Sequence, residues 1–250
     1  MRRLGIIIAI AAGLVAGTVC WTRRGMRWGA TTEEIEATVT GGDWLEGLHG
    51  RRIRMTRAIA IDAPPEEVWP WVAQLGRGAG WYSYERIDNG GRLSARHIVG
   101  WIPEPRVGDA AAIGYLRHVE PGRELVWWAP NAPFLRARTW STFGYLVVGE
   151  GDGSRLQLWV DAVARGLTGP LVVTLVPLVD SVMAVRQLRN LKDRVERYRT
   201  RASDPDDPET GEPDQYQLYH VIYASGSEAG VTGSEGARGS RESARADGVI

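Results

Sequence analysis

The sequence predicts an α+β protein in which a curved antiparallel sheet wraps around a long C-terminal helix and an apolar cavity. Segments with the two-residue alternation of β-strands follow one another between residues 110 and 165, and tight-turn signals separate them. A long stretch with helical periodicity then runs from Gly169 to about Arg199. Strands grouped apart from helices are typical of α+β folds, and a sheet that curls around a helix leaves a cavity suited to apolar ligands.

Composition narrows the classes of function. The 250 residues are 44% hydrophobic and 24% charged, as in ordinary folded proteins. Thirty basic residues balance thirty acidic ones, and no basic stripe interleaved with aromatics occurs, so nucleic acid is not an expected partner. The chain has eleven Trp and only two Phe. Tryptophan suits ligand pockets as well as hydrophobic cores, although any single Trp more often fills a core. Because Cys20 is the only cysteine, an internal disulfide and a cysteine-rich metal site are excluded.

The N-terminal residues predict a membrane anchor. Leu4–Trp21 is an uncharged apolar run that approaches the roughly 20 residues of a membrane-spanning helix. Arginines precede and follow it, so the orientation stays open. The sequence predicts an uncleaved transmembrane helix within residues 1–24, which places the protein in the cell membrane with a single pass. The alternative is a signal peptide cleaved near Ala16–Thr18, which would release a secreted protein.

Three further regions follow the anchor. Residues 25–50 form a connector with a short capped helix, and residues 51–201 form the folded domain. Residues 202–250 are rich in Asp, Pro, Gly, Ser and Glu, which predicts a disordered tail. One apolar island in this tail, residues 216–223, is a candidate docking segment.

The folded domain opens with a strand and two helical segments. Residues 52–61 alternate as in a strand. Asp62–Glu67 carries the capping, proline and acidic residues that begin a helix, which continues through Val68–Leu75 with a possible kink at Pro70. Residues 80–86 predict a second short helix or an ordered loop.

Four strands and a long helix complete the domain. Glu120–Arg123 and Gly149–Ser154 are turn signals. The strands that they join span residues 110–119, 124–129, 138–148 and 155–165. The final helix is apolar in its first half and amphipathic in its second, and Pro177 is expected to bend it. A second membrane span is an alternative, but Pro177 and Asp180 interrupt the short apolar run, which favours a buried helix.

Several segments resemble a known family. Ile59–Trp69 is similar to the opening strand and helix of the START-like superfamily, also called SRPBCC or polyketide cyclase/dehydrase-like proteins. Other segments are similar to its membrane-anchored bacterial members, in order along the chain: Trp28–Thr31, Gln74–Gly76, Gly80–Tyr84, Val107–Asp109 and Glu120–Arg123. The resemblance covers roughly Trp28–Arg199. It implies a helix-grip fold with a hydrophobic cavity, and no single reaction, because members include lipid carriers, hormone binders and cyclases.

Motifs for catalysis are sparse. None of the four histidines has metal-ligand spacing to another His or Cys, so neither a metal nor another cofactor is predicted. No nucleophile elbow, phosphate loop or dinucleotide fingerprint occurs. The candidates for acid–base chemistry are Asp161, Tyr84 and His118. Because the sequence contains no metal, phosphate or nucleophile motif, it favours binding over catalysis.

Cavity-lining candidates come from the first helix, the loop that follows it, the strands and the closing helix. They are Trp69, Val72, Tyr82, Tyr84, Trp127, Arg138, Trp140, Phe143, Trp159, Val176 and Met183. Arg138 and Asp161 are the polar groups expected to orient a ligand. Alternation does not decide which set of strand residues faces the cavity.

Three hypotheses for function follow. The leading one is membrane-tethered binding or transport of a hydrophobic small molecule, lipid or polyketide-like. The second is a cyclase- or dehydrase-like enzyme acting on such a molecule. The third is a structural or interaction protein that recruits partners through its tail.

Overall fold

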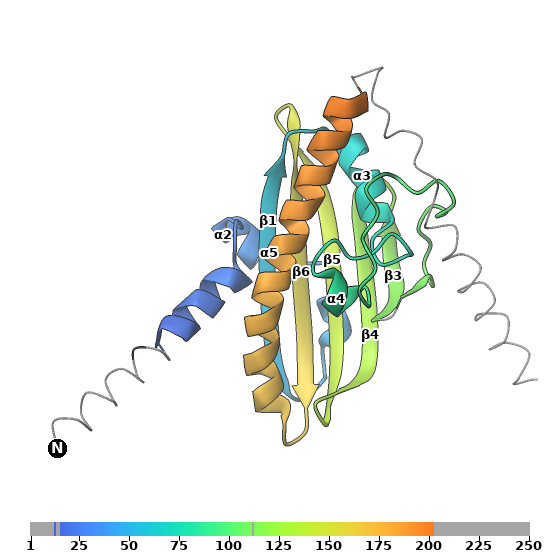
Figure 1. The fold of residues 1–250 in the computed structure, drawn as a ribbon. Coiled ribbons are helices and arrows are strands. Elements are labelled where there is room, and N and C mark those ends of the chain that lie inside the picture. Colours follow the sequence, from blue (N-terminus) through green and yellow to red (C-terminus); the bar gives the residue numbers. More distant parts are fainter. Residues whose placement is uncertain (1–12, 14–15, 112, 203–250) are drawn as a thin grey trace, which may run out of the picture. The chain divides into compact units, whose positions relative to one another are not determined.

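The computed structural model describes residues 13, 16–111 and 113–202. Six antiparallel strands form one sheet in the order β1-β6-β5-β4-β3-β2, and one long C-terminal helix, α5, packs on it (Figure 1). This confirms the predicted α+β class and the antiparallel sheet with its long C-terminal helix. The strands are β1 (Arg51–Ile61), β2 (Ala110–Ala111), β3 (Gly114–Glu120), β4 (Glu124–Phe134), β5 (Ala137–Glu150) and β6 (Gly153–Arg165). The helices are α2 (Thr32–Glu36), the 3-10 helix η1 (Asp43–Leu45), α3 (Pro65–Ala73), α4 (Glu85–Asp88) and α5 (Gly169–Ala202).

The two predicted turns lie where the sequence places them, between β3 and β4 and between β5 and β6. One predicted strand is divided: residues 110–119 form β2 and β3. The break falls between Ala111 and Gly114, and Gly114 has φ 139° and passes so close to the Trp128 carbonyl that a Cβ there would collide with it. A further difference is that β4 continues to Phe134, past an irregularity between Ala129 and Ala132.

The sheet has an inner face, which α5 covers, and an outer face. Contacts to α5 come from Arg57 of β1, which pairs with Asp180, and from Tyr145 of β5, whose hydroxyl donates to Gln187. Residues directly opposite one another on paired strands share a face, so the register extends this assignment across the sheet.

The connector packs on the outer face. Leu45 of η1 forms a buried cluster with Trp128 and Val163, and three partly buried side chains pack against it: Trp44, Leu48 and Trp140. Segment 25–50 is therefore part of the folded structure, and it shields apolar residues that alternation puts on the side away from α5.

Helix α3 begins after Pro64 and buries most of its length, including Trp69 and Val72, where it contacts β5, β6 and α5. Proline suits this first turn because it has no amide hydrogen to leave unpaired. The segment predicted over residues 80–86 as a second short helix or an ordered loop is a loop as far as Tyr84, and the short helix α4 follows it at Glu85–Asp88.

Helix α5 continues through Pro177. In the part of the chain that the structure describes, it is the one helix long and apolar enough to cross a membrane, over Gly169–Thr200, with a mean hydropathy of 1.6 in its most apolar window. One face of α5 packs on the sheet, as expected for a core helix. Residues 16–26 are also helical, but most of the predicted anchor lies outside the described residues, as do residues 203–250 with the island at 216–223.

Candidate functional site

A buried arginine ties three elements together. Arg57 lies on the inner face of β1, and its side chain is fully buried. Its Nε donates to the Gly25 carbonyl at 2.8 Å, and its Nη2 lies 2.7 Å from Asp180 Oδ2 in α5. A Cβ at Gly25 would collide with Ser181, so glycine permits this close approach. Arg57 thereby fixes the end of helix 16–26 against α5.

A pocket of about 540 Å³ lies where residues 21–28 meet α5 and the loop before α4. Its wall contains two tryptophans, a tyrosine, two valines, three arginines and one carboxylate. The lining residues are Trp21, Arg24, Gly25, Trp28, Tyr84, Ser181, Val182, Val185, Arg186, Arg189, Asn190 and Asp193. The volume falls within the range of small-molecule sites, and the wall is more polar than is usual for them.

The loop that carries Tyr84 is strapped to α5 by hydrogen bonds. Ser83 Oγ donates to the Met183 carbonyl at 3.1 Å, and Arg186 Nε donates to the Ser83 carbonyl at 3.1 Å. The Arg186 guanidinium also lies 4.4 Å from the centre of the Tyr84 ring. The two hydrogen bonds of Ser83 fix the loop backbone against α5, and so they fix the position of Tyr84 in the pocket wall.

Trp81, two residues before Ser83 in the same loop, is also held by α5. Gln187 Nε2 donates to the Trp81 carbonyl at 2.7 Å, and Gln187 Oε1 accepts from Tyr145 at 2.9 Å. Burial raises the pKa of Tyr145 well above its usual range, so its hydroxyl keeps the proton that it donates. A chain of two hydrogen bonds between uncharged groups, from Tyr145 of β5 through Gln187 of α5, thus positions Trp81.

Trp81 belongs to an aromatic cluster on the inner face. Trp127 stacks on Phe143 with 6.0 Å between ring centres, and Trp81 is tilted against both. Trp127 is fully buried, and its indole N–H has no acceptor among the described residues. A buried donor without a partner is costly, so the packing of these three rings has to offset the cost.

The structure disperses the residues that the sequence assigned to one cavity. Tyr84 lines the pocket, while Trp127 and Phe143 belong to the inner aromatic cluster and Val176 packs on an inner-face cluster near the start of α5. Trp69 and Val72 are buried in α3, Tyr82 is buried with Gln74 donating to its hydroxyl, and the Met183 carbonyl binds the Ser83 hydroxyl.

Five of the assigned residues lie on the outer face: His118, Arg138, Trp140, Trp159 and Asp161. The structure therefore does not bring them together with the α5 residues. The physical reason is strand alternation: they are out of phase with Phe143 and Tyr145, whose side chains meet Trp81 and α5.

Asp161 is engaged in a structural ion pair. Its carboxylate is fully buried and accepts from Arg52 Nη2 at 2.7 Å and from Arg54 Nη2 at 3.0 Å. The hydrogen bond to Asp161 raises the pKa of Arg52, so the guanidinium stays charged. This arrangement locks β1 to β6 and leaves the carboxylate without a role at the pocket.

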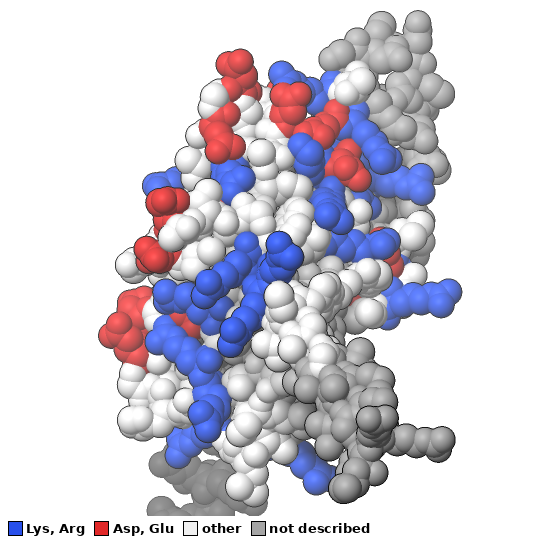
Figure 2. Space-filling model, turned by 90° about the vertical axis from the view of Figure 1, so that its left-hand side faces the viewer, with Lys and Arg blue, Asp and Glu red and all other residues white. Residues whose placement is uncertain are grey.

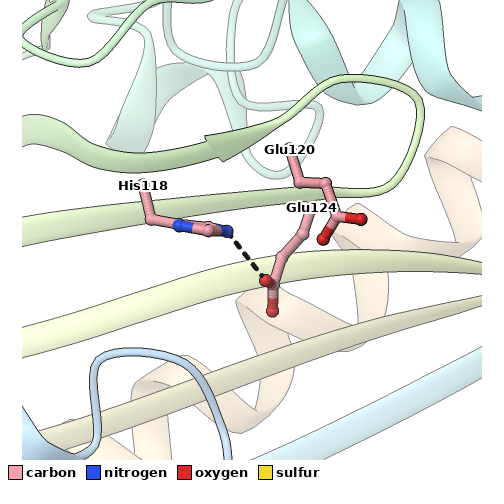
Figure 3. A group of neighbouring side chains, drawn as sticks. All are labelled: His118, Glu120 and Glu124. Carbon is pink, nitrogen blue, oxygen red and sulfur yellow. Dashed lines mark ion pairs between the residues drawn. The ribbon is translucent and has the colours of Figure 1, made fainter.

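His118 forms a cluster that the sequence did not indicate. His118, Glu120 and Glu124 point toward one another, and their ligand-type atoms lie within 4.8 Å (Figure 3). His118 Nε2 and Thr40 Oγ1 lie 3.1 Å and 3.0 Å from the same Glu124 oxygen, and Arg123 pairs with Glu120. Each carboxylate thus already has a protein partner, and the cluster fastens the connector to the sheet.

Neither the arginines of the pocket nor Arg57 is among the site residues predicted from the sequence. A signal for Arg57 was present: it has the same phase as Ile53, Met55 and Ile59 in β1, so the alternation itself placed a charge among buried side chains. No local signal linked Arg24 with Arg186 and Arg189, because more than half of the chain separates them.

Comparisons with known proteins are limited to structure. No protein-family model matches the chain, and no curated protein matches it. Similar solved structures include DynU16 from the dynemicin biosynthetic locus, at 20% identity and a TM-score of 0.34 over 56% of this chain. Another is the di-domain ARO/CYC StfQ from the steffimycin biosynthetic pathway, at 10% identity and a TM-score of 0.39 over 60% of this chain.

A third similar structure is protein MLL2253 from Mesorhizobium loti, at 15% identity and a TM-score of 0.36, with 59% of this chain and 98% of that protein covered. This chain spans about half the length of DynU16 and StfQ, 47% and 52% respectively. At these identities and scores, membership in the START-like superfamily stays a prediction.

Proposed function

We propose that this protein is a membrane-tethered binder or carrier of a hydrophobic small molecule, lipid or polyketide-like. The observation that carries the proposal is the pocket of about 540 Å³ beside α5, whose wall includes Trp21, Trp28 and Val185. The predicted anchor, Leu4–Trp21, ends in this wall, so a molecule dissolved in the bilayer would meet the pocket without crossing water.

The pocket is not where the sequence placed the cavity. The prediction put it between the sheet and α5, whereas this pocket lies against residues 182–193 on the face of α5 that also meets residues 21–28. Large aromatic side chains occupy the inner face beneath the loop, including the stacked pair Trp127 and Phe143. The tether and the domain limits, 1–24, 25–50, 51–201 and 202–250, are part of the proposal.

Filling the pocket tests the proposal. The full chain in mild detergent should bind the neutral fluorescent probe N-phenyl-1-naphthylamine, and Val185→Trp should weaken that binding about tenfold or more, since the larger side chain takes up pocket volume. Fluorescence titration gives the affinity. Val148→Trp, at an exposed position of β5, is the matched control and should bind as the wild type does. A wild-type protein that binds no apolar probe, or equal binding by V185W, would refute the proposal.

A specific observation also favours the cyclase- or dehydrase-like alternative: Tyr84 and Asp193, a potential acid and base, both line the pocket. Asp161 and His118 do not support it, because both lie on the outer face. Mass spectrometry of a bound polyketide-like compound separates the two functions: loss of water that depends on Tyr84 and Asp193 indicates an enzyme, and an unchanged mass indicates a carrier.

A further inference from the structure

One stripe of α5 changes character along its length. Positions 171, 175, 179, 182, 186, 189 and 193 recur at helical spacing of three or four and so share a face. The first four are apolar and unusually open to solvent for their size: Leu171 is 48% exposed, Leu175 38%, Val179 53% and Val182 38%. The last three, Arg186, Arg189 and Asp193, line the pocket. The stripe is thus an apolar track that ends in a charged pocket.

The arginines of the pocket are not neutralised by an ion pair. Arg24, Arg186 and Arg189 have no carboxylate within 4.0 Å among the described residues, although Asp193 shares the pocket with them. The Arg189 guanidinium lies 5.1 Å from the centre of the Trp28 ring. Figure 2, which views the side of the molecule that carries α2, shows basic side chains gathered across it. Three cations beside one carboxylate favour an anionic ligand.

We propose that this surface binds an anionic phospholipid. Its phosphate lies in the pocket between Arg24, Arg186 and Arg189, because guanidinium groups recognise phosphate through paired hydrogen bonds. Its acyl chains run along the exposed track from Val182 towards Leu171, which removes apolar surface from water. Trp21 and Trp28 lie at headgroup level, where tryptophan concentrates in membrane proteins.

Two features of the surface select a lipid over a free anion. The apolar track leads directly into the charged pocket, since Val182 belongs to both. The predicted anchor ends at Trp21 in the pocket wall, which brings the bilayer to this surface. The inference rests on the proposed function, because it names the hydrophobic molecule that the same pocket takes.

The test compares lipids of the same chain length on the full chain in mild detergent. Tryptophan fluorescence is titrated with dioctanoyl phosphatidylglycerol, with dioctanoyl phosphatidylcholine and with inorganic phosphate. Phosphatidylglycerol should bind about tenfold or more tighter than phosphatidylcholine, whose choline offsets the phosphate charge, and its affinity should fall as salt is raised. Inorganic phosphate should bind far more weakly, since it lacks acyl chains.

Two variants locate the binding. Arg186→Gln with Arg189→Gln should remove the preference for phosphatidylglycerol. Arg197→Gln is the matched control: this arginine is also exposed on α5, forms no ion pair among the described residues and lies outside the pocket. The control should keep the preference. Leu175→Asp should weaken both lipids alike, because it charges the track that both sets of chains use.

The outcomes separate this inference from the proposed function. Equal affinity for the two lipids, inorganic phosphate binding as tight as the lipid, or an equal loss in R197Q would overturn the phospholipid site while N-phenyl-1-naphthylamine still binds. A protein that binds neither the neutral probe nor either lipid overturns both. A preference that disappears only in the double variant supports the site.

Discussion

At the scale of single residues, Arg57 shows how a charge can organise a pocket from inside the core. Its guanidinium is fully buried, so it needs Asp180 and the Gly25 carbonyl to replace water. The two partners of this ion pair are not equivalent. Asp180 keeps 32% of its side chain exposed, whereas Arg57 has no exposure. Loss of the carboxylate should therefore cost more than loss of the arginine.

This asymmetry gives a measurable prediction. Asp180→Asn should lower the free energy of unfolding by about 3 kcal/mol, because it leaves a buried cation without its counter-ion. Arg57→Met should cost less, since Asp180 can turn to water and methionine fills similar space. Urea unfolding of both variants gives the comparison, and Asp152→Asn, in the exposed turn after β5, should behave as the wild type does. A larger loss in R57M than in D180N would contradict the argument.

At the scale of elements, the connector is fastened to the sheet at several points. The N-terminus of α2 has a capping box, in which Thr31 Oγ1 accepts from the Glu34 amide and the Glu34 carboxylate accepts from the Thr31 amide. Glu34 also pairs with Arg155 of β6 at 2.8 Å, and both side chains are largely buried. Gly29 lies against the Ala58 carbonyl of β1, where a Cβ would not fit. These contacts hold Trp28, and with it one wall of the pocket.

The carboxylate of Glu34 makes this attachment dependent on pH. The hydrogen bond from Arg155 holds the pKa of Glu34 below its ordinary value of 4.5. The stabilisation is therefore present above about pH 4.5, where the unfolded chain is also ionised, and is lost as pH falls through the lower pKa of the folded state.

Glu34→Gln removes that dependence. At about pH 7 the variant should unfold with about 2 kcal/mol less free energy than the wild type, since a charge-assisted hydrogen bond is lost. At about pH 3 the difference should be smaller, because this pH lies below the ordinary pKa of glutamate, so the unfolded wild type already binds a proton there and the ionised Glu34 contributes less stability. Urea unfolding at both values measures the difference. Glu36→Gln, at the exposed end of α2, is the control. Its free energy of unfolding should not fall below that of the wild type at about pH 7. A constant difference at both values would contradict the linkage.

At the scale of the whole molecule, the position of the pocket relative to the membrane depends on the segment between the predicted anchor and the sheet. Helix 16–26 includes the last residues of the predicted anchor, and Gly25 near its end packs against Ser181 and accepts a hydrogen bond from Arg57. An anchor continuous with this helix would carry the pocket and the exposed track of α5 at a fixed distance from the bilayer. Such an arrangement suits a protein that exchanges ligands with lipid.

Charging the predicted anchor tests this arrangement. Ile7→Arg with Ile10→Arg should move the protein from carbonate-washed membranes to the soluble fraction, because two charges within the apolar run make insertion several kcal/mol less favourable. Val231→Arg, in the C-terminal stretch, should leave it in the membrane. Immunoblots of both fractions give the distribution. A mature chain that begins near Thr18 would instead establish the cleaved signal and contradict the anchor.

Local chemistry was enough for much of the fold. Alternation and the turns at Glu120–Arg123 and Gly149–Ser154 predicted the hairpins, since turn residues set the geometry of the strands that they join. The apolar periodicity after Gly169 predicted α5. The same periodicity already placed Val182 and Val185 on the helix, although it did not show which neighbours they would meet.

The sequence by itself determined which residues share a face of a strand or a helix, and tertiary structure decided what covers each face. Trp140 and Asp161 lie under or beside the connector rather than α5, because alternation is symmetric between the two sides of a sheet. The pocket joins Arg24 to Arg186 and Arg189 across most of the chain. Such a site depends on packing between distant elements, and packing depends on side-chain shape and charge in three dimensions, which no local pattern contains.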